Sequence, residues 1–280
     1  MGTLYIDHSI VTHAPSWPAV DDVLAGGKAQ LVLSLWNLFE IGSASDKAQQ
    51  DQRLAFLAKF HPIWALERVE IQRHEVRAFL WQAKLGKAPE PTEVFKRHLS
   101  ELEVYQAGYR TRVGLTPRQW IDGVNFQNFE RYKELAPTAL RQLQAAGAKK
   151  IAQRQDEIFR KWIQALLPTK NPEGIAFSKV EMADLSKFCE DNQAAFYDAC
   201  PAMAVEDAMT RARTAAATRN PQSSDGIDLM HAVVALAYCD CFLTRDRFVF
   251  HCCEHVRKEL SSKKLATVYR DAETLKQALA

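Results

Sequence analysis

Short apolar runs and longer amphipathic stretches alternate along the first part of the chain. Residues 4–6, 30–33 and 63–66 favour buried β-strands, and residues 35–41 and 67–85 follow the second and third of these with helical patterns. A strand followed by a helix, repeated along the chain, is typical of a parallel α/β sheet. This part of the sequence therefore predicts an α/β fold.

The middle of the chain has a different pattern. Residues 86–91 have the sequence Gly-Lys-Ala-Pro-Glu-Pro, which is typical of a boundary, and a long helical pattern follows. The α/β alternation then returns, with an apolar helix at 228–239 and strands at 241–244 and 265–269. We therefore predict a first core part at 1–85, a large all-helical insertion at 86–199 and a second core part at 200–280.

Composition narrows the class of protein. The chain has 280 residues, of which 47% are hydrophobic and 25% charged, so it can bury a large core. No apolar stretch approaches the roughly 18 residues of a membrane span. The N-terminal sequence has neither a basic region nor an apolar signal core, and six cysteines are too few for a disulfide scaffold. We therefore expect a cytoplasmic protein with reduced cysteines and no membrane segment.

The charge is distributed unevenly. The net charge is only +2, but residues 86–170 contain 15 basic and 9 acidic residues, an excess of +6. A basic segment beside a neutral core attracts phosphate backbones, although a solvated helix face gives the same count. Contact with nucleic acid and a plain solvated surface therefore both stay open for this segment.

Four carboxylates stand where a parallel sheet brings side chains together. Asp7 ends the first predicted strand, Asp246 follows the strand at 241–244, Asp228 begins a helix, and Glu40 lies among apolar residues of a helix without an obvious lysine or arginine partner. The ends of parallel strands form the crevice where ligands bind. Four carboxylates about 5 Å apart repel by roughly 3 kcal/mol per pair, so cations would stabilise them. Oxygen ligands suit Mg²⁺ or Mn²⁺.

These segments carry a resemblance to a known family. The sequences Leu-Tyr-Ile-Asp7, Leu-Phe-Glu40, Asp228-Leu-Met-His and Thr244-Arg-Asp246 resemble those of the PIN-domain nucleases. The resemblance implies a three-layer α/β/α sandwich with a short central parallel sheet. It also implies that these four acids bind Mg²⁺ or Mn²⁺ for RNA hydrolysis, which leaves a 5′-phosphate and a 3′-hydroxyl. Thr244 matches a small hydroxyl residue often found near the last acid.

The chain also departs from the family pattern. His8 and Ser9 stand where PIN domains usually have Thr or Ser followed by Asn or a similar polar residue. The resemblance covers the two flanks, roughly 165 residues, and the insertion of more than 100 residues is foreign to the short PIN toxins. A role as a toxin is therefore not carried over.

The favoured hypothesis is a metal-dependent endoribonuclease. Asp7 would bind the principal ion, Asp228 and Asp246 would complete the metal shell, and Glu40 would hold a second ion or orient the attacking water. Single-stranded RNA is the expected partner. The alternatives are an inactive PIN-like module that binds RNA or protein, and a DNA nuclease that uses the same site. A homo-oligomer or an inhibitory protein partner also stays open.

Several other residues are secondary candidates. Ser9 is close in sequence to Asp7, and His231 lies one turn after Asp228, so it either reaches the acidic site or is a core histidine. Glu75 and Asp225 are reserve acids that we expect to be solvated, with Asp225 in a turn. A zinc site is the less favoured interpretation of a cysteine and histidine group, because free cysteines are common in cores. The group contains Cys239, Cys241, His251, Cys252, Cys253 and His255.

Aromatic residues recur every three positions in the insertion. Phe126, Phe129 and Tyr132 follow Trp120 in the sequence. Exposed rings at this spacing would stack on bases. The buried stripe of an amphipathic helix is the favoured interpretation.

Overall fold

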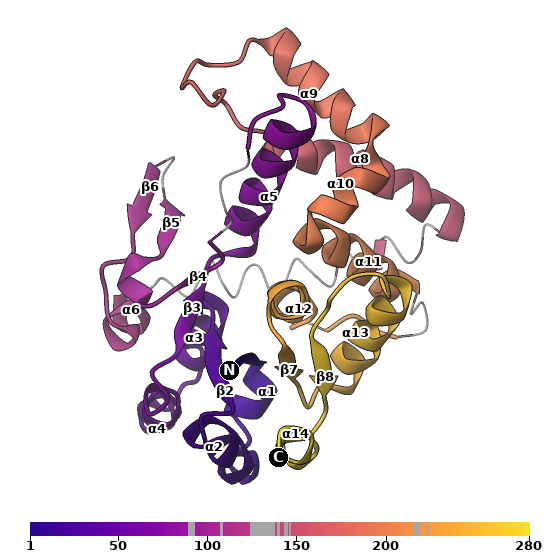
Figure 1. The fold of residues 1–280 in the computed structure, drawn as a ribbon. Helices are drawn as coiled ribbons and strands as arrows, with labels where there is room; N and C mark the ends of the chain where they lie inside the picture. Colours follow the sequence, from indigo (N-terminus) through magenta and orange to yellow (C-terminus); the bar gives the residue numbers. More distant parts are fainter. Residues whose placement is uncertain are drawn as a thin grey trace.

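A computed structural model gives the fold of the protein (Figure 1). The structure describes residues 1–88, 93–106, 109–123, 138, 141–142, 145, 147–215, 219–222 and 224–280. Phe126, Phe129 and Tyr132 lie outside the described residues, so the interpretation of the aromatic repeat stays a prediction. Among the described helices, none is long and apolar enough to cross a membrane.

A mixed sheet organises the molecule. The strand order is β4-β3-β2-β1-β7-β8, and all neighbouring strands are parallel except β3 and β4. The bounds are β1 Gly2–Ile6, β2 Ala29–Leu33, β3 Ile63–Ala65, β4 Phe95–Lys96, β7 Cys241–Leu243 and β8 Thr267–Tyr269. The predicted parallel sheet is therefore confirmed, including its strands near residues 4, 30, 63, 241 and 267.

Strand β1 lies at the centre of this sheet. Its neighbours are β2, where Leu4 pairs with Leu31, and β7, where Ile6 pairs with Leu243. Leu4, Tyr5 and Ile6 are fully buried. A strand covered on both faces has a continuous apolar run rather than an alternating pattern, which explains the sequence of this segment.

Helices connect and cover the strands. In the first part of the chain they are α1 His8–Val11, η1 Ala14–Ser16, α2 Trp17–Ala25, α3 Leu35–Gly42, α4 Lys47–Ala58 and α5 Arg68–Ala83. The middle contains η2 Leu99–Glu101, α6 Pro117–Gly123, α8 Gly147–Leu166, α9 Lys179–Asp191 and α10 Gln193–Ala199. The last part contains α11 Pro201–Ala215, α12 Asp225–Tyr238, α13 Arg247–Glu259 and α14 Ala272–Ala278.

The main core surrounds the sheet. Helix α2 packs against α14, while α11, α12 and α13 pack against one another, with α12 also against β7. Apolar residues of all these elements form one buried cluster with the strands. This α/β arrangement is consistent with the predicted three-layer sandwich.

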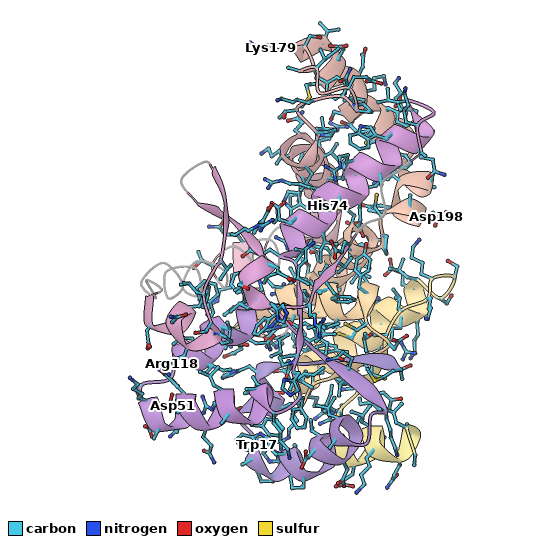
Figure 2. The ribbon with its side chains drawn as sticks, turned by 60° about the vertical axis from the view of Figure 1, so that its left-hand side comes forward. Trp17, Asp51, His74, Arg118, Lys179 and Asp198 are labelled. Carbon is cyan, nitrogen blue, oxygen red and sulfur yellow. The ribbon has the colours of Figure 1, made fainter. Side chains whose placement is uncertain are left out.

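A second core lies beyond the sheet. Phe196 of α10 makes edge-to-face contacts with Phe79 of α5 and Phe159 of α8, and Cys189 and Met203 are buried with them. Figure 1 shows α5, α8, α9 and α10 together above the sheet. In Figure 2, Lys179 and Trp17 lie at opposite ends of the molecule, and His74 of α5 lies between them. The second core therefore combines helices of the predicted insertion with α5 of the first part.

The prediction that residues 86–199 contain helices alone is wrong. Strand β4 pairs with β3 at the edge of the main sheet, and β5 (Glu103–Gln106) pairs with β6 (Tyr109–Arg112) in a separate antiparallel ribbon. Val94, Leu99 and Val113 are buried in the main core. Strands of two to four residues are too short to produce a recognisable period of two. The domain division at residues 85 and 199 stays a prediction.

Candidate active site

The first strand ends at a buried aspartate. Asp7 follows β1 and is 4% exposed, and Thr244 follows the neighbouring strand β7 and is fully buried. The Thr244 hydroxyl donates a hydrogen bond to Asp7 Oδ2, and the Ser9 hydroxyl donates one to Asp7 Oδ1 at 2.5 Å. The backbone N–H of Arg245 in turn donates to Ser9 Oγ at 2.8 Å. Thr244 and Ser9, both predicted as supporting residues, therefore hold the Asp7 carboxylate between adjacent strand ends.

The buried position of Asp7 changes its acidity. Burial raises the pKa of the Asp7 carboxyl to about 6, against the lowering effect of its hydrogen bonds from Ser9 and Thr244. The charge of Glu40 also raises this pKa, while His231 lowers it. The charged form of Asp7 is therefore costly in the fold, as expected for a carboxylate that a cation would stabilise.

Glu40 belongs to a buried hydrogen-bond chain. Its Oε2 lies 2.7 Å from Nε2 of His231, and Nδ1 of the same imidazole lies 2.6 Å from the Tyr5 hydroxyl. The Tyr5 hydroxyl also lies 2.7 Å from Ser34 Oγ and 3.2 Å from Asn37 Oδ1. The partner that sequence reasoning could not find for Glu40 is therefore a histidine, and the chain of contacts links α12, β1 and α3.

His231 is a core histidine and also contacts one of the four acids, so both interpretations from the sequence apply. Its side chain is 1% exposed, as expected for a core histidine, yet it contacts the side chain of Glu40. A second histidine approaches the same carboxylate, because His8 Nδ1 lies 3.9 Å from Glu40 Oε2. Glu40 therefore has imidazoles as neighbours, where the sequence showed no lysine or arginine.

Asp228 joins the other acids from the first turn of α12. It is partly buried and lies one turn before His231. Burial raises the pKa of the Asp228 carboxyl well above its usual value, and the charges of Glu40, Asp7 and Asp246 raise it further. The charges of the other three acids therefore act on Asp228. The structure thus brings together Asp7, Glu40, Asp228 and Asp246, which we call the acidic cluster.

Asp246 is both a helix cap and a member of the acidic cluster. Its Oδ1 accepts a hydrogen bond from the N–H of Val249 at 2.8 Å, which caps α13. Its own N–H donates to Thr244 Oγ1 at 3.1 Å. Arg245 and Arg247 on either side are exposed. The cap fixes Asp246 near the C-terminal end of β7, next to the C-terminal end of β1 where Asp7 lies.

Two reserve acids were predicted to be solvated, and for both the prediction is wrong. Asp225 is 1% exposed, and its Oδ2 accepts hydrogen bonds from Arg219 Nη1 at 2.6 Å and from the N–H of Gln222 at 2.9 Å. Glu75 is 2% exposed and lies under the start of α11. Polar sequence neighbours suggested exposure, but an arginine or a helix N-terminus compensates each charge.

The donor set of the acidic cluster suits a hard divalent cation. The four members offer only carboxylate oxygens, the ligands that Mg²⁺ and Mn²⁺ prefer. Within the described part of the chain, no three His, Cys, Asp or Glu side chains are already arranged as a metal site. The four carboxylates are therefore not arranged as a metal site in this structure. The carboxylate oxygens are suitable ligands for Mg²⁺ or Mn²⁺, and ion binding would have to bring them closer together.

The alternative zinc group has less suitable donors. All six cysteines are free and buried. Burial raises the pKa of the Cys239, Cys252 and Cys253 thiols, so it disfavours the thiolate that binds zinc. These cysteines instead form part of the main core.

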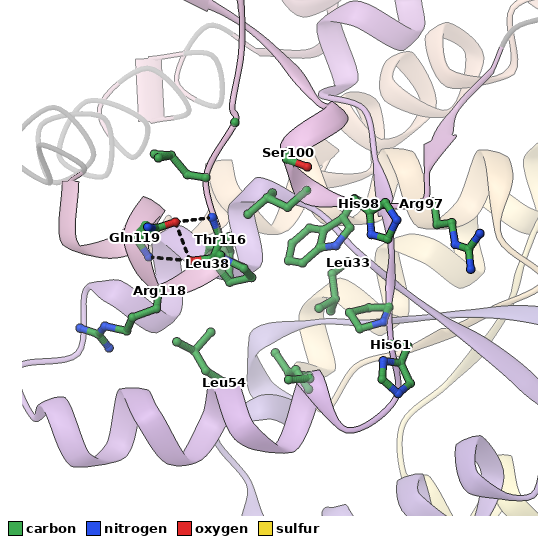
Figure 3. A pocket seen from close by; sticks show the side chains of 18 of the residues that line it. Leu33, Leu38, Leu54, His61, Arg97, His98, Ser100, Thr116, Arg118 and Gln119 are labelled. Atoms are coloured by element: carbon green, nitrogen blue, oxygen red, sulfur yellow. Dashed lines mark hydrogen bonds between the residues drawn. The ribbon is translucent and has the colours of Figure 1, made fainter.

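A separate pocket of about 740 Å³ lies beside α3 and α4 (Figure 3). Leu38 and Leu54 contribute to its apolar wall, and Thr116 and Gln119 are hydrogen-bonded to each other at its edge. Leu38 and Glu40 are two residues apart, which places them on nearly opposite sides of α3. The pocket is therefore distinct from the acidic cluster.

Comparisons with protein-family models, with curated proteins and with solved structures find no match to this chain. Membership of the PIN family therefore stays a prediction based on the four motifs.

Proposed function

We propose that the protein is a divalent-metal-dependent endoribonuclease with a PIN-like site. The observation that carries the proposal is the acidic cluster itself, in which Asp7 and Glu40 from the first 40 residues meet Asp228 and Asp246 from the last part of the chain. Buried like charges destabilise a fold unless protons or counterions neutralise them. A cluster of this kind is typical of metal-assisted phosphodiester hydrolysis.

Each member of the acidic cluster has a role in this proposal. Asp7, Asp228 and Asp246 would hold the principal ion, and Glu40 would hold a second ion or orient the attacking water. Such ions, when bound, would stabilise negative charge on the phosphate oxygens and lower the pKa of water. Thr244 keeps the Asp7 carboxylate oriented through its hydrogen bond. His231 fixes the direction of the Glu40 carboxylate.

Positive side chains beside the cluster support a polyanionic substrate. Arg245 and Arg247 flank Asp246 and are exposed, and Arg219, whose charge interacts with Asp246 and Asp228, is one-quarter exposed. Arginines close to a catalytic centre position a phosphate backbone without reading its sequence. The basic excess at 86–170 adds to this proposal, although part of that segment lies outside the described residues.

The direct test is cleavage of a single-stranded RNA with Mn²⁺ or Mg²⁺. Cleavage is expected to stop with a chelator and with Asp7→Asn. The matched control is Asp240→Asn, because Asp240 lies at the opposite end of β7 and bonds Thr3 there. Strong cleavage by the Asp7→Asn protein would contradict the proposed roles.

The alternatives predict other outcomes of the same experiment. An inactive binding module would bind RNA without cleavage, and calorimetry would show no Mn²⁺ binding that depends on Asp7. A DNA nuclease would cut a DNA oligonucleotide in preference to an RNA of the same sequence. We propose RNA because the four acidic motifs and the neighbouring Thr244 resemble those of a ribonuclease family.

A further inference from the structure

Arg219 is held beside the acidic cluster by two unlike contacts. Its Nη1 lies 2.6 Å from Oδ2 of Asp225, a residue that is 1% exposed. Its guanidinium carbon lies 3.7 Å from the centre of the Phe248 ring. An ion pair on one edge and an aromatic ring on one face fix the plane of a guanidinium. Arg219 is therefore preorganised rather than a mobile surface side chain.

The contacts of Arg219 with Asp225 and Phe248 place it beside the first turns of α12 and α13. Its charge interacts with Asp246 and Asp228 as well as with Asp225. Asp225 and Asp228 are three residues apart on α12, so they lie on the same side of that helix. Phe248 follows Asp246 by two residues in α13. The guanidinium thus lies where the first turns of α12 and α13 meet.

The side chain of Arg219 remains reachable from solvent. It is 25% exposed, whereas the Asp225 side chain beneath it is 1% exposed. A substrate phosphate that approaches the four carboxylates is repelled by them, and a fixed cation at their margin offsets part of that repulsion. A planar guanidinium also matches two phosphate oxygens at once.

We propose that Arg219 is a substrate-binding residue that contacts a phosphate of the RNA strand beside the acidic cluster. This assignment rests on the proposed nuclease function and extends it to a defined phosphate contact. Asp225 and Phe248 are positioning residues in this arrangement, because they hold the guanidinium and need not touch the strand. The competing explanation is that Arg219 only neutralises the buried charge of Asp225.

The test compares Arg219→Gln with the double variant Arg219→Gln/Asp225→Asn. The single variant is expected to raise KM for RNA about tenfold or more. The double variant removes the uncompensated Asp225 charge as well, so it separates the two explanations. A KM that stays raised in the double variant supports the phosphate contact, whereas a KM that returns to the wild-type value overturns it.

Binding gives a readout that is independent of turnover. In an Asp7→Asn background, Arg219→Gln is expected to weaken single-stranded RNA binding about 5- to 30-fold. It should also reduce the slope of log affinity against log salt by about 0.7, the value for one lost phosphate contact. An unchanged affinity and slope would contradict the assignment.

The control is Arg211→Gln. Arg211 also pairs with acids, namely Asp207 and Glu259, but Glu259 is the last residue of α13 and Asp246 caps its first turn. The control should leave KM and the salt slope unchanged, and equal losses in both variants would overturn a specific role for Arg219. A wild-type protein that does not cut RNA would overturn the proposed function itself. A wild-type protein that cuts RNA, with an Arg219→Gln variant of normal KM, would overturn only this inference.

Discussion

The acidic cluster and Glu75, which lies between the main core and the second core, both include buried carboxylates, but they differ in the groups that surround each charge. Glu75 accepts bonds from the N–H groups of Ala202 and Met203 at 2.7 and 3.2 Å, and from the Tyr238 hydroxyl at 2.5 Å. The two N–H groups belong to the start of α11, where a helix favours negative charge. In contrast, no side-chain hydrogen bond of Asp228 is found among the described residues.

The difference distinguishes a structural carboxylate from one that is available to a ligand. Burial raises the pKa of Glu75 to about 7 and that of Asp7 to about 6, so both charges are costly. At Glu75, three donors compensate the charge and join α5 to α11 and α12. At the acidic cluster, Glu40 contacts His231 and Asp7 accepts hydrogen bonds from Ser9 and Thr244, but the charges of the other acids raise the pKa of Asp228, so a cation would stabilise the cluster. A raised pKa alone would not have separated the two sites.

The largest effect that would sharpen this comparison is expected from Asp7→Asn. We expect RNA cleavage to fall about 10³-fold, equivalent to about 4 kcal/mol of activation free energy. Without divalent ions, the free energy of unfolding should instead rise at pH 8, because a costly buried charge is removed. Kinetic assays and denaturant titration measure the two quantities. Loss of both activity and stability would contradict the comparison.

Glu75→Ala, between the two cores, is expected to reduce stability. Three donors would lose their acceptor, and we expect the free energy of unfolding to fall by about 3 kcal/mol. The matched variant Glu75→Gln keeps one carbonyl oxygen and should cost about 1 kcal/mol. Cleavage per folded molecule should be unchanged in the Gln variant. A large loss of kcat there would show that Glu75 belongs to the reaction.

The pH dependence of stability should separate the two regions. The pKa of Asp7 is raised from 3.8 to about 6, so the native state binds more protons than the unfolded state between about pH 4 and 6. The free energy of unfolding therefore falls as the pH rises through this window, by about 2 kcal/mol from Asp7. Glu75, raised from 4.5 to about 7, acts with the same sign up to about pH 7.

Two variants show which carboxylate causes each part of this pH dependence. Denaturant titrations at several pH values should show a smaller slope below pH 6 in Asp7→Asn and a smaller slope near pH 6 to 7 in Glu75→Gln. Mg²⁺ or Mn²⁺ should restore stability at pH 7 to 8 in the wild type but not in Asp7→Asn. Equal restoration in both would place the ion elsewhere.

The smallest effect is expected from Thr244→Val. The variant removes the hydroxyl that donates to Asp7, and we expect cleavage to fall about tenfold, equivalent to about 1.4 kcal/mol. Thr3→Val is the control, because the Thr3 hydroxyl is hydrogen-bonded to Asp240 at the N-terminal ends of β1 and β7. Steady-state kinetics of both variants make the comparison. Equal cleavage rates of the two variants would show that Thr244 has no role in the site.

The sequence predicted the parallel sheet and the four acids because each leaves a local signal. Asp7 and Asp246 follow apolar strands, and Glu40 interrupts an apolar helix. The hydrogen bond between Tyr5 and His231 leaves no local signal in the sequence, because 226 residues separate the two. Tyr5 also resembles any other core residue of its strand. Glu75 had polar neighbours that favoured exposure. Such pairings depend on how helices pack, which short-range patterns do not contain.

The central place of β1 also has a consequence for synthesis of the protein. During translation, Asp7 precedes the strand next to Thr244 by more than 230 residues. The last acid follows at position 246. If the proposed activity holds, the nascent chain therefore cannot cut the RNA that encodes it before residue 246 has been translated.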